Sequence, residues 1–376
     1  MNKIESLINK LCPNGVIHKK LGDLVKIEKG KQLNKTHLFD EYEEGLFPVI
    51  NGGIAPSGYW NEYNYNENLI TISQGGASAG YVNYIETKFW AGAHCYVVAR
   101  VEDEIMYRYI YHFLKSKEVE LQNSQVGAGI PSVSLKDINN LKVAVPPLEI
   151  QSEIVHILDS FTSLSMKLLA EKTARKKQFE YYRDSLLKFD NNVPRIKLGD
   201  ICKITSGGDV PKEHWSKEKT DKYPIPIFSN GVEEDGLYGY TDVARITEPS
   251  VSIAGRGAGC GNAILRKEPY FPIIRLLSLV PSEKVNVDYL FYCIKTIRFQ
   301  IPRSGIPQLT VPMVSEYTIP VPSLDEQKRI VNALEKFDVL CNDLTQGLPA
   351  EIEKRQKQYE YYRDKLLSFK EVETNE

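Results

Sequence analysis

The chain has 376 residues, of which 42% are hydrophobic and 26% are charged, so it has the size and composition of a soluble protein with two or more globular domains. A net charge of −2 argues against a protein that covers nucleic acid with one broad basic surface. The apolar runs are too short to span a bilayer and the first residues have the spacing of an amphipathic helix, so we expect a cytoplasmic protein without a signal peptide.

The first globular segment covers about residues 1–145. Short β-like runs such as "NLITISQ" (68–74) and "HCYVVARV" (94–101) alternate with turn signals, and one helix is predicted over 105–121. The second globular segment, about 190–320, has the same texture and one predicted helix over 287–299. Both segments are therefore expected to be α+β domains.

A long helix is predicted after each globular segment. The first begins after Pro146 and Pro147, and its apolar residues step by three and four, as in a coiled coil. The second begins at a capping box formed by Ser323 and Glu326. It is four residues longer near "TQGLPAEIE", where Pro349 predicts a kink or a break into two segments.

The two halves of the chain are repeats of one another. "HKKLGDLVKI" (18–27) recurs as "RIKLGDICKI" (195–204), and "GIPSVS" (129–134) recurs as "GIPQLT" (305–310). The repetition is strongest in the helices, where "QFEYYRDSLLKF" (178–189) returns as "QYEYYRDKLLSF" (358–369). The globular segments match least well, so the two domains have diverged on a common scaffold.

Each helix has more apolar surface than a private hairpin of two helices would cover. Tyr181 next to Tyr182, and Tyr361 next to Tyr362, form a second flank beside the coiled-coil seam. We expect helices of a partner protein to cover these flanks, and a purely internal role is the alternative. The candidate partner-binding residues are Phe179, Tyr181, Tyr182, Leu186, Tyr359, Tyr361, Tyr362 and Leu366.

No catalytic or metal-binding motif is found. The six cysteines are single and are expected to be free thiols, and the histidines show no spacing typical of a metal site. The glycine runs "QGGASAG" (74–80) and "GRGAGCG" (255–261) match neither a phosphate-binding loop nor a dinucleotide fingerprint, so tight hairpin turns are the favoured interpretation. The chain is interpreted as a binding protein and not as an enzyme.

The order of these motifs resembles the specificity (S) subunit of type I restriction–modification systems over essentially the full chain. "LGD", a GIP element, "VPPLEIQ" and the tyrosine helix appear once, and then again as "LGD", GIP, "VPSLDEQ" and the second tyrosine helix. The resemblance implies two similar α+β target recognition domains separated by two long antiparallel coiled-coil helices in a pseudo-two-fold internal repeat. The corresponding boundaries are 1–147 for the first domain, 148–189 for the first helix, 190–322 for the second domain and 323–376 for the second helix.

The resemblance also implies a function. Each domain would read one half of a bipartite, asymmetric site on double-stranded DNA, and the helices would set the unread spacer and dock the methyltransferase (M) subunits, of which two are expected. Restriction (R) subunits would join this core. S-adenosylmethionine, ATP and Mg are expected in the partner subunits, and no cofactor is expected in this chain.

Loop residues suited to hydrogen bonds with base edges or phosphates are the candidates for DNA contact, because arginine pairs well with guanine and glutamine or asparagine with adenine. In the first domain they are Lys31, Gln32, Asn34, Lys35, Gln74 and Ser78, and in the second Asp209, Lys212, His214, Arg256 and Asn262.

Two other functions stay open on these residues. One is a coiled-coil adaptor that carries two domains with no affinity for DNA. The other is an enzyme fused to its own recognition module, which the missing catalytic motifs disfavour.

Overall fold

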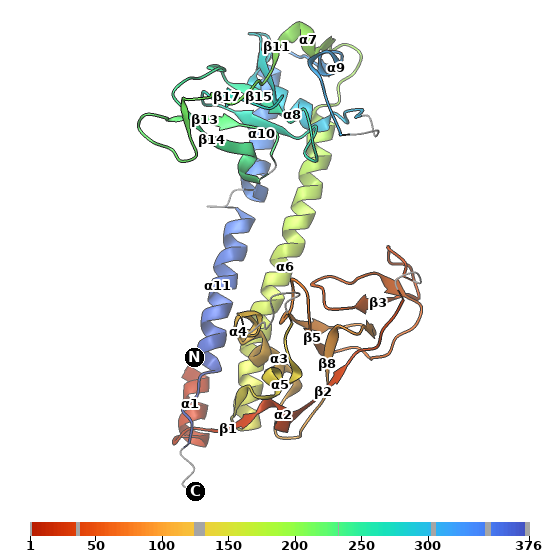
Figure 1. The fold of residues 1–376 in the computed structure, drawn as a ribbon, viewed down its shortest axis with the longest axis vertical. Helices are drawn as coiled ribbons and strands as arrows, with labels where there is room; N and C mark the ends of the chain where they lie inside the picture. The colour runs from red at the N-terminus through yellow and green to blue at the C-terminus, as the bar shows by residue number, and fades with distance from the viewer. Residues whose placement is uncertain are drawn as a thin grey trace. The chain divides into compact units, whose positions relative to one another are not determined.

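The structure is a computed structural model that describes residues 2–34, 38–123, 132–231, 233–301, 306–342 and 347–372. The chain divides into two compact units (Figure 1). Unit 1 contains Met1–Leu169 and Glu351–Glu376, and unit 2 contains Ala170–Ala350. Each unit therefore combines one globular domain with parts of the long helices. Within the described residues, no helix is both long and apolar enough to cross a membrane.

The domain of unit 1 is built on two sheets. The larger is antiparallel, in the order β2-β8-β5-β6, and the smaller has the order β4-β3-β7. Their strands are β2 (Val25–Lys29), β3 (Phe47–Ile50), β4 (Tyr59–Trp60), β5 (Leu69–Ser73), β6 (Val82–Ile85), β7 (Trp90–Ala91) and β8 (Cys95–Val101). The larger sheet and the helices around it enclose the main apolar core of the unit, which includes Ile70, Ile72 and Val98.

The domain of unit 2 repeats this plan. Its larger sheet has the order β11-β18-β15-β16, and its smaller sheet has the order β12-β14-β13-β17. The strands are β11 (Cys202–Ser206), β12 (Trp215–Ser216), β13 (Ile225–Phe228), β14 (Leu237–Thr241), β15 (Ser250–Ile253), β16 (Ala263–Arg266), β17 (Phe271–Pro272) and β18 (Leu277–Pro281), with a 3₁₀ turn at Glu233–Gly236. The α+β class predicted for both domains is confirmed.

Three helices of the domain in unit 1 have counterparts in unit 2. Unit 1 contains α1 (Asn2–Leu11), α2 (Leu21–Leu24), α3 (Tyr107–Ser116), α4 (Glu118–Asn123) and α5 (Leu135–Asn139), and unit 2 contains α7 (Leu198–Ile201), α8 (Val287–Thr296) and α9 (Val311–Ser315). Helices α2, α3 and α5 correspond to α7, α8 and α9. The prediction of a single helix over 105–121 is wrong, because the structure has two helices there. Lys117, with ψ near 0°, lies between α3 and α4 and is not helical. The helix predicted over 287–299 is three residues shorter at its end.

A short antiparallel ribbon leads each domain into its long helix. In unit 1, β1 (Ile17–Lys20) pairs with β9 (Lys142–Val145), and in unit 2, β10 (Arg195–Lys197) pairs with β19 (Thr318–Pro320). The chain then enters α6 (Leu148–Leu186) or α10 (Leu324–Asn342). The start of the domain and the start of the helix are thereby held side by side.

A buried glutamine fixes each domain to its helix. Gln151 and Gln327 have no exposed surface. The Gln151 side-chain oxygen accepts a hydrogen bond from the Met106 amide at 2.7 Å, and its nitrogen donates to the carbonyls of Glu104 and Pro146 at 2.9 and 2.8 Å. Because Met106 is the N-cap residue of α3, one side chain joins that helix, the ribbon and α6.

The second glutamine makes the same three bonds. Gln327 accepts from the amide of Asn286, the N-cap residue of α8, at 2.8 Å. It donates to the carbonyls of Lys284 and Pro322 at 3.0 and 2.9 Å. These glutamines belong to the repeated segments "VPPLEIQ" and "VPSLDEQ", so the strong repetition there has a structural cause.

The long helices pair within each unit. In unit 1, α11 (Leu348–Leu366) runs beside the first part of α6 in the opposite direction, and Phe161 stacks on Tyr362 with ring centroids 5.5 Å apart (Figure 1). In unit 2, Tyr182 stacks on Phe337 of α10 at the same distance. The second long helix is divided into α10 and α11, and Pro349 lies in the first turn of α11, so the predicted break is confirmed.

Replacing Gln151 with Ala should lower the free energy of unfolding by roughly 2–4 kcal/mol, because three backbone groups lose the side chain to which they bond and a buried side chain is truncated. Urea denaturation of the full chain measures the change. Gln356→Ala is the matched control, since Gln356 is an exposed glutamine of α11 whose side chain bonds to Glu360 of the same helix. Equal stability of the two variants would contradict the role given to Gln151.

Candidate nucleic-acid interface and helix faces

The glycine hairpins close one end of the larger sheet in each domain. They connect β5 to β6 and β15 to β16, as the sequence predicted. Gly76 and Gly257 adopt positive φ angles of 84° and 88°, and a Cβ at either position would meet nothing within 4 Å. The tips of both hairpins are therefore open turns. Glycine is favoured there because of the positive φ angle, and not because a side chain would clash with a neighbour.

Each hairpin is also bridged to the segment that follows the GIP element. Gly75 pairs with Ser132 in domain 1, and Arg256 pairs with Gln308 in domain 2. Gly129–Pro131 and Gly305 themselves lie outside the described residues. The glycine hairpin and the segment after the GIP element are thus joined at the same end of the sheet in both domains.

The candidate residues of domain 1 fall into two groups. Lys31, Gln32 and Asn34 lie exposed on the loop after β2, where the Lys31 amide donates to the Ala91 carbonyl at 2.8 Å, and Lys35 lies outside the described residues. Ser78 is on the hairpin, and its hydroxyl donates to the Gly52 carbonyl at 2.7 Å. This bond holds the hairpin against the 50–53 segment, so Ser78 has a positioning role.

Gln74 stands at the base of the same hairpin. Its amide donates to the His94 carbonyl at 2.9 Å, and its side-chain oxygen is buried without a hydrogen-bond partner among the described residues. His94 is an exposed neighbour that the sequence analysis did not select.

The candidate DNA-contacting residues of domain 2 lie on the loop after β11 and on the glycine hairpin. Asp209, Lys212 and His214 are exposed on the loop after β11, and His214 lies 3.3 Å from a carboxylate oxygen of Asp242. Arg256 is half-buried on the hairpin. Asn262 accepts a hydrogen bond from Lys295 of α8 at 3.4 Å, so its side-chain oxygen is turned toward that helix.

The tyrosine helices have an inner and an outer face. On the inner face, Phe179 packs edge-to-face on Tyr292, Tyr182 stacks on Phe337, and Tyr362 stacks on Phe161. Tyr359 and Leu366 are buried in the core of unit 1, and Leu186 packs against the core of unit 2. On the outer face, Tyr181 and Tyr361 are 71% and 62% exposed. Of the eight candidate partner-binding residues, these two equivalent tyrosines are the most available to another protein.

Tyr359 is held by a buried polar chain that sequence reasoning missed. Its hydroxyl lies 3.2 Å from Nδ1 of His112, and Nε2 of His112 lies 2.8 Å from a carboxylate oxygen of Asp159. Arg108 pairs with the same carboxylate. The three linked residues come from α11, α3 and α6, so they hold three helices of unit 1 together.

Burial and hydrogen bonds set the protonation states of His112 and Asp159. His112 has no exposed surface, and this desolvation lowers its pKa despite the neighbouring carboxylate. Burial opposes the ionisation of Asp159, but hydrogen bonds from His112 and Arg108 outweigh it and lower its pKa to about 2. Neutral His112 then donates from Nε2 to Asp159 and accepts the Tyr359 hydroxyl at Nδ1. His112 is enclosed, and both of its ring nitrogens are used in joining three helices, so we interpret the set as structural although Asp159 remains partly exposed.

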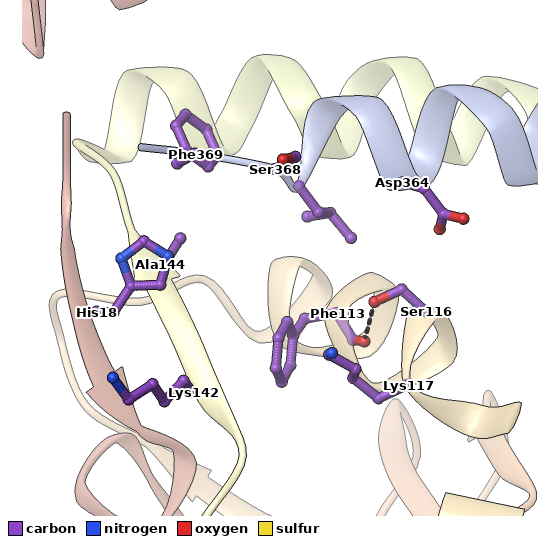
Figure 2. A pocket seen from close by; sticks show the side chains of 10 residues that line it. His18, Phe113, Ser116, Lys117, Lys142, Ala144, Asp364, Ser368 and Phe369 are labelled. Atoms are coloured by element: carbon purple, nitrogen blue, oxygen red, sulfur yellow. Dashed lines mark hydrogen bonds between the residues drawn. The ribbon is translucent and has the colours of Figure 1, made fainter. Parts of the chain in front are cut away.

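A cleft of about 410 Å³ opens in unit 1 where α3, the β1–β9 ribbon and the end of α11 meet (Figure 2). His18 and Lys142 project from the ribbon, Lys117 follows α3, and Asp364 lies on α11. A cleft of about 340 Å³ occupies the equivalent place in unit 2 and contains Arg195. The recurrence shows that both clefts arise from the shared scaffold, and neither includes a candidate DNA-contacting residue.

Comparison with known proteins identifies the family. The family described as type I restriction modification DNA specificity domain matches residues 13–175 and, a second time, residues 191–354. The chain belongs to this family. The predicted recognition of DNA sequence is therefore confirmed, and the adaptor without affinity for DNA is not favoured. Membership also agrees with the interpretation of the chain as a specificity subunit and not as an enzyme.

Relatives match this chain nearly end to end. It is 31% identical to the EcoR124I/EcoR124II specificity subunit of Escherichia coli over 389 residues, covering 94% of each chain. It is also 31% identical to S.MpnORF507P of Mycoplasma pneumoniae, which is named as a type I specificity subunit, with 93% of this chain and 97% of that one covered. The crystal structure of a type I S subunit from M. genitalium shares the fold, with a TM-score of 0.60 at 20% identity over 93% of this chain and 96% of that one.

The stability of unit 1 should fall as the pH drops below about 6.5. Below this pH, His112 takes up a proton more readily in the unfolded chain than in the folded one, where burial lowers its pKa. The free energy of unfolding therefore decreases, by at most about 1.4 kcal/mol per pH unit for this one group. Urea denaturation between pH 5 and 7.5 measures this slope. His112→Gln should reduce it, and His156→Gln, at an exposed histidine of α6, should not. Identical slopes in the two variants would exclude His112 as the titrating group.

Proposed function

We propose that the chain is the DNA-reading subunit of a type I restriction–modification complex and binds a bipartite, asymmetric site on double-stranded DNA. One half-site is read by the domain of unit 1 and the other by the domain of unit 2. The observation that carries this proposal is the contrast between a repeated scaffold and divergent loops. Gln151 and Gln327 make the same bonds, whereas the hairpin of domain 2 carries Arg256 at the position where domain 1 has Gly75.

The asymmetry of the target follows from that contrast. Two copies of one reading surface would select equal half-sites in inverted orientation, by the symmetry that links repeated domains to palindromic DNA. Surfaces with different side chains select different bases because each base pair presents its own set of donors and acceptors in the major groove. The long helices would then set the number of unread base pairs between the half-sites.

The outer faces of the helices are proposed to bind two methyltransferase subunits. Tyr181 and Tyr361 occupy equivalent positions of the repeat and are both exposed, which suits two copies of one partner. Exposed aromatic side chains at matched positions are typical anchors of protein interfaces. The partners would supply S-adenosylmethionine-dependent methylation of adenine, and restriction subunits would supply the functions that need ATP and Mg.

Exchanging residues 20–145 for those of a family member should change one half-site and leave the other intact. The junctions lie at Lys20 of β1 and Val145 of β9, so the exchanged domain keeps the ribbon position and the Gln151 contacts to the host helix. Mapping of methylated adenines in cells that express the hybrid with the methyltransferase reads both half-sites. Changes in both, or in neither, would refute the assignment of one half-site to each domain.

Replacing Tyr181 and Tyr361 together with Ser should weaken binding of the methyltransferase subunits by about tenfold or more, because each substitution removes a large apolar contact. Replacement of Glu180 and Glu360 with Ala is the matched control, since both are exposed neighbours on the same helices. Calorimetry with the purified methyltransferase measures both variants. Unchanged affinity of the tyrosine variant would place the docking surface elsewhere.

A further inference from the structure

A strained turn in domain 2 lies beside the glycine hairpin. Between β17 and β18, Ile274 and Arg275 adopt positive φ angles of 51° and 61°. Left-handed backbone is unfavourable for a β-branched residue, and such strain is kept where surrounding contacts enforce it. Both side chains are nevertheless exposed, at 48% for Ile274. The fold therefore places an isoleucine and an arginine on the surface in a conformation that neither residue favours.

The turn is fixed by backbone bonds to the loop after β11. The Ile274 amide donates to the Gly208 carbonyl at 2.8 Å, and the Arg275 amide donates to the Gly207 carbonyl at 3.1 Å. The Leu276 amide closes the turn by donating to the Ile273 carbonyl at 3.0 Å. This loop also carries Asp209 and Lys212, so the turn and two of the candidate DNA-contacting residues belong to one surface.

Asn230 joins the same turn to the hairpin. Its side-chain nitrogen donates to the Ile274 carbonyl, and its side-chain oxygen accepts from the Gly255 amide at 2.8 Å. A Cβ at Gly255 would lie 2.4 Å from the Arg275 carbonyl oxygen, so the two backbones are in direct contact. Arg256, the next residue of the hairpin, and Arg275 are consequently held close to each other on rigid backbone.

A third arginine joins this surface. A guanidinium nitrogen of Arg245 lies 3.0 Å from the position of a Cβ at Gly208. Arg245, Arg256 and Arg275 form no ion pair with any residue in the described part of the chain. The turn, the loop after β11 and the hairpin are tied together by backbone bonds and by the Asn230 side chain. Three arginines without acidic partners on this surface are arranged for an external group that accepts hydrogen bonds.

Domain 1 has a corresponding turn, between β7 and β8, with other side chains and without the left-handed backbone seen at Ile274 and Arg275. In this turn the side-chain oxygen of Asn51 accepts from the His94 amide at 3.2 Å. Gln74 and His94 occupy the positions of Gly255 and Arg275, and the Gln74 amide bonds directly to the His94 carbonyl. The position of the turn is therefore shared by the two domains, whereas its left-handed backbone is seen in domain 2 and its exposed residue differs, being His94 in domain 1 and Arg275 in domain 2.

We propose that this surface reads bases, with Arg275 and Arg256 recognising guanine in the half-site of domain 2 and His94 occupying the equivalent reading position of domain 1. The proposal rests on the proposed function. Arginine forms two parallel hydrogen bonds to O6 and N7 of guanine, a contact that requires a fixed donor position. Phosphate contacts tolerate a mobile side chain, whereas this turn is held in a strained conformation by four hydrogen bonds.

The test is selection of duplexes from a pool of randomised DNA by the complex of the full chain with its methyltransferase subunits. Arg275→Lys keeps the positive charge but loses the two-pronged donor, and Arg275→Gly suits the left-handed backbone, so that strain does not prevent folding. Both should lower the preference for one guanine of one half-site by about tenfold or more and leave the other half-site unchanged. His94→Ala should alter only the other half-site.

Arg298→Ala is the matched control, because Arg298 is an exposed arginine of domain 2 after α8 and should leave both half-sites unchanged. If Arg275→Lys selects the wild-type sequence while Arg275→Gly weakens binding to all sequences alike, Arg275 contacts phosphate and the proposal is wrong. It is also wrong if both variants behave as wild type. A wild-type complex that selects no sequence would instead overturn the proposed function itself.

Discussion

The buried glutamines at the helix starts are the constraint on which the rest of the structure depends. The buried side chains of Gln151 and Gln327 each bond to three backbone groups, and each joins a domain helix to a long helix. Leaving such groups unpaired costs more than a typical surface contact contributes. The position of a domain on its helix is therefore set away from the loops, and the loops can change without disturbing it.

The inner faces of the tyrosine helices add a second constraint. The two helices have nearly the same sequence, yet Tyr359 meets His112 in unit 1, whereas Phe179 meets Tyr292 in unit 2. An exchange of the two helices would leave Nδ1 of buried His112 facing a phenylalanine without a hydrogen-bond donor. We infer that this difference helps each helix to pair with its own domain. The outer faces repeat without such a difference, as the proposed binding of two copies of one partner would require.

The sequence predicted those features that depend on local pattern or on repetition. Heptad spacing indicated the long helices, Pro349 the break between α10 and α11, and the glycine runs the hairpins. It could not predict the pairing of His112 with Asp159, because the two residues are far apart in the chain and neither lies in a motif. Nor did it indicate Arg275, since left-handed backbone is normally announced by glycine or asparagine. A position-by-position comparison of the two repeats, which pairs Arg275 with His94, was the available signal.

We propose that one chain carries two different reading surfaces and that the long helices set the number of base pairs between the two half-sites. Long-read mapping of methyladenine in a host that expresses this chain with its methyltransferase tests the claim most directly. The account predicts one motif made of two unlike half-sites with a constant number of unspecified base pairs between them. A single continuous motif, two identical inverted half-sites, or a variable spacer would contradict it.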